Sequence, residues 1–302
     1  MRKKNLLTEL NEMKMSYLFI LPAIGLFLVF IIVPIFFSFF LSFTKYNVFQ
    51  APQWIGLGNY KQILMHDERF WKTMRNTLFY VVGVVPIGVT LALILAIAVD
   101  QKIRAKNFFK TMFFLPTVTS IVAVSVIWKW MLAGEKYGLI NNFLMKFGIQ
   151  PIDWLMSVQW TLPSIMIMDI WRGIGYNMLL FLAGLQTIPK VMYEAADIDG
   201  AGTWDKFWNV TLPLLRPTMV FVGIMAFIVS FQMFDQVYIM TGGESGIGGV
   251  LDCALTGVPY LYDEGFSKFR MGYASALAYI IFGCIMVVTL ANMRFLKTKV
   301  KY

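Results

Sequence analysis

Two ionisable residues lie inside an apolar stretch that is long enough to cross a lipid bilayer. Asp169 stands about nine residues into the run 160–185, and Arg172 follows one helical turn later. Charged groups at such depth are costly and mark candidate functional sites. Side chains at i and i+3 share a helix face, so the two could form an ion pair that only stabilises the bundle. The alternative is a solute path, whose further lining residues would be Trp171, Tyr176 and Asn177.

A second polar group ends the next apolar run, about 218–240. Gln232 and Asp235 supply an amide and a carboxylate, and Phe234 and Tyr238 supply aromatic rings. Amides bind sugar hydroxyls and rings stack on the apolar faces of sugars, so this group predicts a sugar path. The alternative is a hydrated helix end whose aromatic residues anchor it at the membrane surface.

Soluble catalytic motifs are absent from the sequence. It holds no GxxxxGK[ST], no GxSxG and no glycine-rich fingerprint between a strand and a helix. Its one histidine and two cysteines, Cys253 and Cys284, without CxxC spacing, predict no metal site. We therefore predict no catalytic residue and no enzyme activity. A chain of this kind that moves a solute uphill needs energy from another subunit or from an ion gradient.

The elements that must position these residues are membrane spans. The 302 residues are 58% hydrophobic and 14% charged, against about 25% charged in soluble domains. The net charge of +9 is spread in small groups between apolar runs, which does not suggest nucleic-acid binding. We predict an all-α polytopic membrane protein, with residues 1–302 as a single transmembrane domain. Its six spans are predicted at about 17–43, 76–99, 111–131, 160–185, 218–240 and 271–293.

The distribution of lysine and arginine predicts how the chain lies in the membrane. Both tails, the link between spans two and three, and the link between spans four and five carry more of these residues than the three opposite segments. Basic residues concentrate on the cytoplasmic side. Both termini and the link between spans four and five are therefore predicted to be cytoplasmic.

That link contains a polar stretch, residues 193–217, for which bilayer insertion gives no reason. Glu194–Ala196 favours helix, and Asp197–Gly200 is a turn signal. A short amphipathic run over 204–210 then reaches Leu212–Pro213. The pattern predicts helix, turn, helix and stop, and indicates a docking element for something outside the bilayer.

This stretch resembles the cytoplasmic loop of binding-protein-dependent ABC importer permeases, whose pattern is EAA-xx-DGA-x5-F-x4-LP-xxx-P. The chain reads EAADIDGAGTWDKFWNVTLPLLRP here. The matching residues are Glu194, Ala195, Ala196, Asp199, Gly200, Ala201, Phe207, Leu212, Pro213 and Pro217.

Most of the remaining chain is similar to the sugar branch of that family, the maltose-permease and glycerol-3-phosphate-permease group. The segments NMLLFLAGLQTIPKVMYEAADIDGA, FQMFDQVYIMTGG and FRMGYASALAYIIF carry this resemblance. Two departures stand out. The chain lacks the large outer domain of the maltose permease, and Glu244–Ser245 replaces a frequent Gly-Pro. The substrate of a relative therefore cannot be transferred to this chain.

The resemblance implies a type I ABC importer permease in the plasma (inner) membrane of a prokaryote. Its partners would be a second homologous permease subunit, two ATPase subunits and an extracytoplasmic solute-binding protein. ATP and Mg²⁺ would bind the ATPases, and this chain would bind no cofactor. In such permeases the loop forms a coupling helix in a groove of an ATPase. Glu194 would offer a charge, Ala195 and Ala196 would allow close approach, Gly200 would make the turn and Phe207 would anchor the loop.

The solute itself stays open between several possibilities. Neutral polar and aromatic candidates favour an uncharged oligosaccharide, while Arg172 leaves room for an anionic solute such as a glycerol phosphate or a uronate. An alternative from another class is an ion-coupled secondary transporter, with Asp169 and Asp235 as coupling carboxylates.

Overall fold

The computed structural model describes residues 6–101, 104–134, 137–242 and 246–296. The outer parts of the basic tails and Glu244–Ser245, which entered the predictions above, lie outside those ranges. The chain divides into two compact units. One comprises residues 1–65 and 264–279, and the other comprises 66–263 and 280–302. We describe each by itself.

The first unit begins with one long apolar helix. α1 (Leu6–Phe27) passes through a π-helical turn, η1 (Leu28–Ile32), into α2 (Val33–Ser42). Pro34 lies in the first turn of α2, where a missing N–H is tolerated. Residues 14–42 are long and apolar enough to cross a bilayer, and none of the most apolar part is buried within the chain. Its side chains therefore present an apolar surface suited to lipid, as predicted for the first span.

Short elements complete the first unit. The strand β1 (Thr44–Lys45) pairs antiparallel with β2 (Gln53–Trp54). Buried Asn59 donates to the carbonyl oxygens of Ser42 and Thr44, at 2.9 Å each, and so links α3 to the end of α2 and to β1. The other elements are α3 (Gly58–His66), η4 (Asp263–Ser267) and the first turns of α14 (Met271–Leu296).

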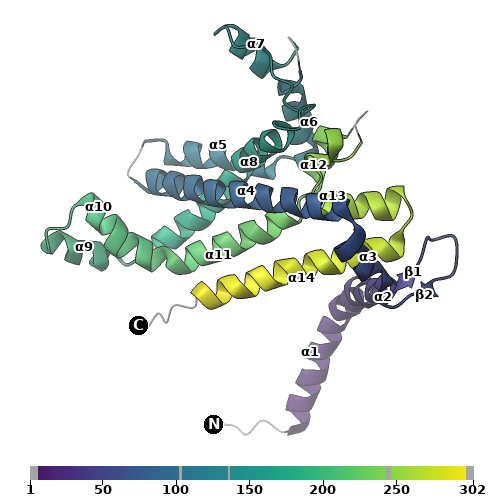
Figure 1. The fold of residues 1–302 in the computed structure, drawn as a ribbon. Helices are drawn as coiled ribbons and strands as arrows, with labels where there is room; N and C mark the ends of the chain where they lie inside the picture. The colour runs from purple at the N-terminus through teal and green to yellow at the C-terminus, as the bar shows by residue number, and fades with distance from the viewer. Residues whose placement is uncertain (1–5, 102–103, 135–136, 243–245, 297–302) are drawn as a thin grey trace. The chain divides into compact units, whose positions relative to one another are not determined.

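Three helices form the centre of the second unit. α4 (Glu68–Asp100) packs along α8 (Thr161–Gln186), and α11 (Leu212–Phe231) packs against both (Figure 1). Two apolar clusters fill the contacts, one around Tyr80, the other around Phe181. The shorter elements are α7 (Leu139–Met145), α9 (Lys190–Ile198), α10 (Thr203–Lys206), η2 (Phe207–Thr211), α12 (Asp235–Thr241), η3 (Val250–Asp252) and α13 (Gly257–Tyr262).

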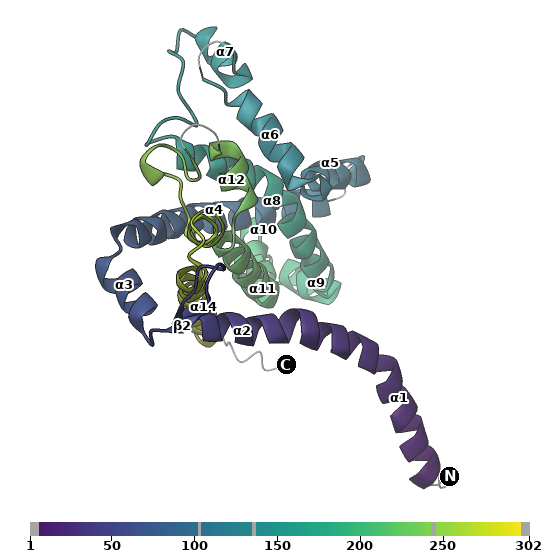
Figure 2. The same ribbon diagram turned by 90° about the vertical axis from the view of Figure 1, so that its right-hand side faces the viewer.

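The predicted third span, 111–131, is not one straight helix. It consists of α5 (Lys106–Val118) and α6 (Ile121–Met131), which meet at 94° (Figure 2). Thr119 and Ser120 have extended ψ angles of 143° and 128°, which end α5 and start α6. Within the described ranges, five helices could cross a bilayer, and six if this bent pair counts as one span. The predicted all-α polytopic fold is confirmed.

The fifth span also differs from its prediction of 218–240. A continuous helical segment runs over 203–231, so the expected stop at Leu212–Pro213 is wrong. Pro213 lies in the first turn of α11, and the π-helical turn η2 before it accommodates the missing hydrogen bond. At the other end α11 stops at Phe231, and the next helix, α12, begins at Asp235.

Candidate functional site

The carboxylate of Asp169 is held by two neutral donors from other helices. Tyr80 on α4 donates its hydroxyl to Oδ2 at 2.5 Å, and Gln236 on α12 donates its amide to Oδ1 at 2.9 Å. Tyr80 is fully buried and Gln236 nearly so. Among the described residues, Asp169 and Arg172 make no ion pair within 4.0 Å, so the expected intrahelical pair is not formed.

A cavity of about 320 Å³ opens beside this group, and we call it the intramembrane cavity. Helices α4, α5, α8 and α11 all contribute to its lining. The wall is mostly apolar, as in ligand-binding pockets, which place a few polar groups in a hydrophobic surround. Its polar lining residues are Thr117, Asp169, Arg172, Tyr176, Asn177 and Ser230.

Arg172 stands out among these residues. In the part of the chain that the structure describes, its Nε is buried and has no hydrogen-bond partner. The backbone around it is fixed, since Thr117 donates its hydroxyl to the Arg172 carbonyl oxygen at 2.8 Å. Three residues on, a Cβ on Gly175 would lie 2.0 Å from the carbonyl oxygen of Phe113. Only glycine allows α5 to approach α8 this closely, which brings Thr117 into the cavity wall.

The predicted solute-path residues fall into four groups, of which the fourth is an aromatic cluster. Arg172 and Asn177 line the intramembrane cavity. Trp171 lies on Trp128 of α6, with ring centroids 5.6 Å apart. Gln232, at the end of α11, and Asp235, at the start of α12, are exposed at the break between the two helices.

Phe234 and Tyr238 form an aromatic cluster with Tyr262 of α13. Centroid distances are 5.3 Å between Phe234 and Tyr238, 5.1 Å between Phe234 and Tyr262, and 5.6 Å between the two tyrosines. Electrostatic interaction with Tyr238 is the main cause that raises the pKa of the Tyr262 hydroxyl. The structure therefore places these two predicted residues together, but the lining of the intramembrane cavity does not include them.

Of the two residues that bind Asp169, Tyr80 was not predicted from the sequence, and Gln236 was predicted only as one of the amides at the end of the fifth span. Tyr80 lies in a charge-free run, where sequence alone predicts that an aromatic residue packs in the core. Its hydrogen-bond partner Asp169 lies 89 residues further along the chain. Gln236 is adjacent to Asp235, and the structure turns the amide inward and the carboxylate outward. Only the helical position of residue 236 relative to the break could have indicated this.

The stretch predicted to couple the chain to a partner, residues 193–217, is ordered by local interactions. Helix α9 ends in a Schellman motif, in which Ala201 N donates to Ala196 O at 2.9 Å and Gly200 N donates to Asp197 O at 3.1 Å. Gly200 has φ of +76°, a left-handed conformation that glycine adopts without strain. The predicted turn is therefore present, directly after Asp199, the C-cap residue of α9.

Side-chain contacts attach this loop to the helices behind it. The hydroxyls of Tyr193 and Thr211 are 3.0 Å apart, and Lys206 forms an ion pair with Asp197. Half-buried Phe207 lines a small hollow beside Asp100 at the end of α4. The half-buried Leu212 packs on the cluster around Phe181, while Pro213 is exposed. The loop is thus a fixed projection and not a free linker.

The loop exposes large apolar side chains beside acidic ones. Ile198 is 87% exposed and Trp204 is 70% exposed. Glu194, Ala195 and Asp199 are also exposed, and Ala196 and Ala201 are half-buried. Large apolar side chains left uncovered on a fixed projection make the loop a candidate protein-interaction site. The small alanines beside them leave room for close approach by another backbone.

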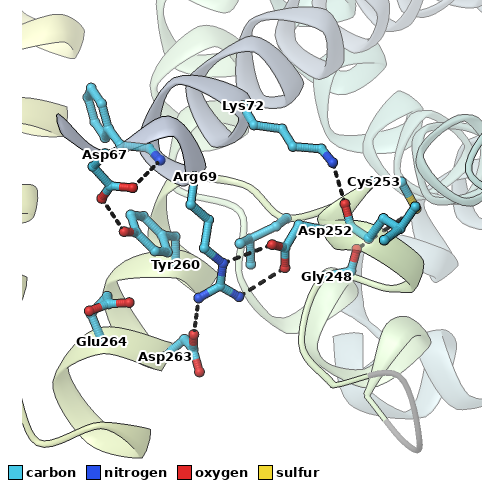
Figure 3. A network of polar contacts seen from close by, with 12 residues as sticks. Asp67, Arg69, Lys72, Gly248, Asp252, Cys253, Tyr260, Asp263 and Glu264 are labelled. Carbon is cyan, nitrogen blue, oxygen red and sulfur yellow. Dashed lines mark hydrogen bonds and ion pairs between the residues drawn. The ribbon is translucent and has the colours of Figure 1, made fainter. Parts of the chain in front are cut away.

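At the opposite end of the second unit, α4 begins in a polar cluster around Arg69 (Figure 3). Its guanidinium binds both carboxylate oxygens of Asp252, at 2.8 and 2.9 Å, and Asp263 at 2.5 Å. Asn76 donates to the carbonyl oxygens of Asp252 and Leu255, at 2.8 and 3.0 Å. Leu251 and Asp252 have φ of 53° and 55°, so these bonds hold a strained turn in place.

Metal binding receives no support from the geometry. Within the described ranges, no group of three or more His, Cys, Asp or Glu residues is placed to hold a metal ion. That the chain binds neither metal nor cofactor stays a prediction.

The fold and these sites define a class of protein, a multi-pass helical membrane protein with an intramembrane cavity of about 320 Å³ and a projecting loop. Residues 88–302 match the family described as "Binding-protein-dependent transport system inner membrane component". The chain belongs to this family, the permease subunits of ABC importers, as the loop motif predicted.

Individual relatives cover nearly the whole chain. It is 38% identical over 284 residues to the lactose transport system permease protein LacF of Rhizobium radiobacter, covering 93% of this chain and 92% of the relative. It is 34% identical over 279 residues to the arabinooligosaccharides transport system permease protein AraP of Bacillus subtilis, covering 92% and 87%.

A solved structure shows the same fold. The chain resembles a subunit of a bacterial alginate ABC transporter in complex with an alginate pentasaccharide-bound periplasmic protein. The TM-score is 0.83 at 22% identity, over 98% of this chain and 99% of that subunit. The predicted type I ABC importer permease fold is confirmed.

Proposed function

We propose that this chain is the permease subunit of an ABC importer for a sugar, in particular an oligosaccharide. It conducts the solute and couples its passage to ATP hydrolysis on separate ATPase subunits. It catalyses no covalent step itself. The observation that carries the coupling role is the projecting loop 193–217, with Ile198 and Trp204 uncovered and the Gly200 turn fixed.

The loop can transmit movement to the intramembrane cavity because it connects α8 to α11 along the chain. Both helices line the intramembrane cavity. A push on α9 passes through Tyr193, Phe207 and Leu212 to the buried contacts of these helices. Packed helices move as rigid bodies, so a movement of the ATPases would alter the cavity's access to either side.

The sugar assignment is supported by relatives and by the site. The printed names of two relatives specify lactose and arabinooligosaccharides. A cavity of about 320 Å³ suits part of a sugar chain, and amide, hydroxyl and aromatic groups around it are typical of sugar recognition.

The assembly we propose contains a second homologous permease, two ATPases and an extracytoplasmic binding protein. Both termini and the loop 193–217 face the cytoplasm in the inner membrane of a prokaryote. The positive-inside distribution of Lys and Arg supports this orientation.

Reconstituted transport tests the proposal. The complete complex is placed in proteoliposomes with its binding protein outside, and a radiolabelled oligosaccharide that thermally stabilises that binding protein serves as cargo. We expect accumulation that requires ATP inside the vesicles and survives ionophores. Accumulation that ignores ATP and collapses with an ion gradient would instead establish a secondary transporter, with Asp169 and Asp235 as its coupling carboxylates.

A further inference from the structure

The intramembrane cavity contains one cation whose charge is not directly paired. Arginine stays protonated in proteins and offers five N–H donors in a planar fork. Within the described chain, Arg172 makes no side-chain hydrogen bond or ion pair, and its buried Nε has no partner. A buried N–H without an acceptor is costly, so something in the working protein is expected to satisfy it.

The neighbouring carboxylate does not fill this role. Both oxygens of Asp169 are occupied by Tyr80 and Gln236, at 2.5 and 2.9 Å. Neither donor lines the cavity, so the hydrogen bonds that Asp169 accepts come from α4 and α12 and not from the other lining residues. Its charge still acts on Arg172 through space, but in the described structure neither of its oxygens accepts a hydrogen bond from the guanidinium.

The rest of the cavity wall lacks a competing anion. Around Arg172, the described lining residues are valines, glycines and other apolar side chains, with Thr117, Tyr176, Asn177 and Ser230 as neutral polar groups. The hydroxyl of Thr117 is already committed to the Arg172 carbonyl oxygen. The arrangement is one fork-shaped cation in a largely apolar surround, with a tyrosine and an amide one turn away.

We propose that the intramembrane cavity recognises an anionic group on the sugar, a carboxylate or a phosphate, through the guanidinium of Arg172. This deepens the proposed function and rests on it, and it reverses the preference for an uncharged solute that the sequence suggested. A carboxylate or phosphate presents two oxygens that match the guanidinium fork. Asn177 and Tyr176 then remain for the sugar's hydroxyls and ring, which makes Arg172 a specificity-determining residue.

The test measures binding to the complete transporter in nanodiscs without its binding protein, so that only the membrane complex selects. The radiolabelled probes are digalacturonate, galactose 6-phosphate and galactobiose. We expect at least one anionic probe to bind about tenfold or more tightly than galactobiose. A preference for digalacturonate assigns the group to a carboxylate, and a preference for galactose 6-phosphate assigns it to a phosphate.

Variants then assign the preference to one side chain. Arg172→Gln should weaken binding of the preferred anionic probe about 30-fold or more, as expected when one partner of a buried charge pair is lost. Galactobiose binding should change less than about twofold. Arg172→Lys keeps the charge but loses the fork, so it should be intermediate. The matched control is Lys146→Gln, which removes an exposed positive charge outside the cavity and should change nothing.

The proposal is overturned if galactobiose binds as well as the anionic probes, if no probe binds, or if Arg172→Gln leaves anion binding unchanged. Should that variant fail to assemble, the wild-type preference and the intermediate value of Arg172→Lys decide the question. ATP-driven uptake of a neutral sugar with no anion preference would overturn this proposal alone and leave the proposed function standing. Failure of ATP-driven uptake of the binding protein's own ligand would overturn the proposed function.

Discussion

The projecting loop, residues 193–217, and the intramembrane cavity are built by opposite means. The loop takes its shape from neighbouring residues, through the Gly200 turn and the Tyr193–Thr211 contact, and leaves Ile198 uncovered. The cavity is assembled from four helices far apart in sequence, and Asp169 is held by residues 89 and 67 positions away.

Because of this difference, we expect the loop to keep its partner and the cavity to be the part that can change its solute. A loop with local geometry keeps its shape whatever the cavity contains, so it can present the same surface to an ATPase throughout a family. A cavity lined by single side chains from several helices can alter its preference through one substitution. Damage should therefore be separable, with loop variants losing energy coupling and cavity variants losing solute recognition or stability.

The largest effect is expected from Gly200→Val in the loop. A Cβ at this position would meet nothing within 4 Å, so the effect is conformational and not a clash. A left-handed conformation costs an L-residue about 1–2 kcal/mol, and a β-branched one more. We expect ATPase coupling and uptake to be abolished while membrane insertion is normal.

Gly200→Asn is the matched control, because asparagine tolerates φ near +76°. It should retain most of the uptake. Wild-type uptake by Gly200→Val would show that the turn has no part in coupling.

Asp169→Leu should disrupt the hydrogen bonds that hold α4, α8 and α12 together beside the intramembrane cavity. It removes the acceptor of Tyr80 and Gln236, and each buried donor left unsatisfied costs about 1–3 kcal/mol. We expect a lower unfolding temperature of the detergent-solubilised complex, measured by tryptophan fluorescence. Asp153→Leu, at an exposed carboxylate, should leave it unchanged. Equal unfolding temperatures for the two variants would refute the buried network.

Ile198→Ser tests whether the uncovered face of the loop is a docking surface. The side chain is 87% exposed, so its loss should change the free energy of unfolding by less than about 0.5 kcal/mol. Affinity for the ATPase should fall about tenfold, as for an apolar interface residue worth more than about 1 kcal/mol. Pull-down titrations measure this, and Phe147→Ser, 69% exposed on another segment, is the control. An equal loss of ATPase affinity in both variants would indicate non-specific binding through exposed apolar side chains.

The smallest effect is expected at the break between α11 and α12. Asp235 lies in the first turn of α12, where a carboxylate interacts favourably with the helix dipole by about 0.3–1 kcal/mol. Asp235→Ala and Gln232→Ala should lower uptake about two- to fivefold with complex assembly intact. Unchanged uptake in both would remove these residues from the solute path.

Local features were predictable from the sequence because their causes are local. The motif around Gly200 fixes its own turn, and charge-free runs locate the first, fourth and sixth spans within a few residues. The break at Thr119–Ser120 was not predicted, because neither residue ends a helix by itself and an apolar run continues through it. On either side of the break, α5 packs against α8 and α6 packs against α12, and sequence alone does not reveal these tertiary contacts.

Only part of the cavity's polar arrangement was predictable from the sequence, because it also depends on tertiary packing. Asp169 and Arg172 are visible as charges in an apolar run, and their spacing suggested that they pair. Which of them receives partners depends on Tyr80 and Gln236, brought in by tertiary packing. The structure thereby gives Asp169 two hydrogen-bond partners and, within the described chain, leaves Nε of Arg172 without one.

The central claim is that residues 193–217 dock on an ATPase at the cytoplasmic face, and photo-crosslinking tests it most directly. A benzophenone amino acid replaces Ile198, the most exposed large apolar residue of the loop, in the complete transporter. Irradiation should join this chain to the ATPase subunit, whereas the same probe at Phe147 should not. Crosslinking of position 198 to the binding protein, or to lipid alone, would contradict both the orientation and the coupling role.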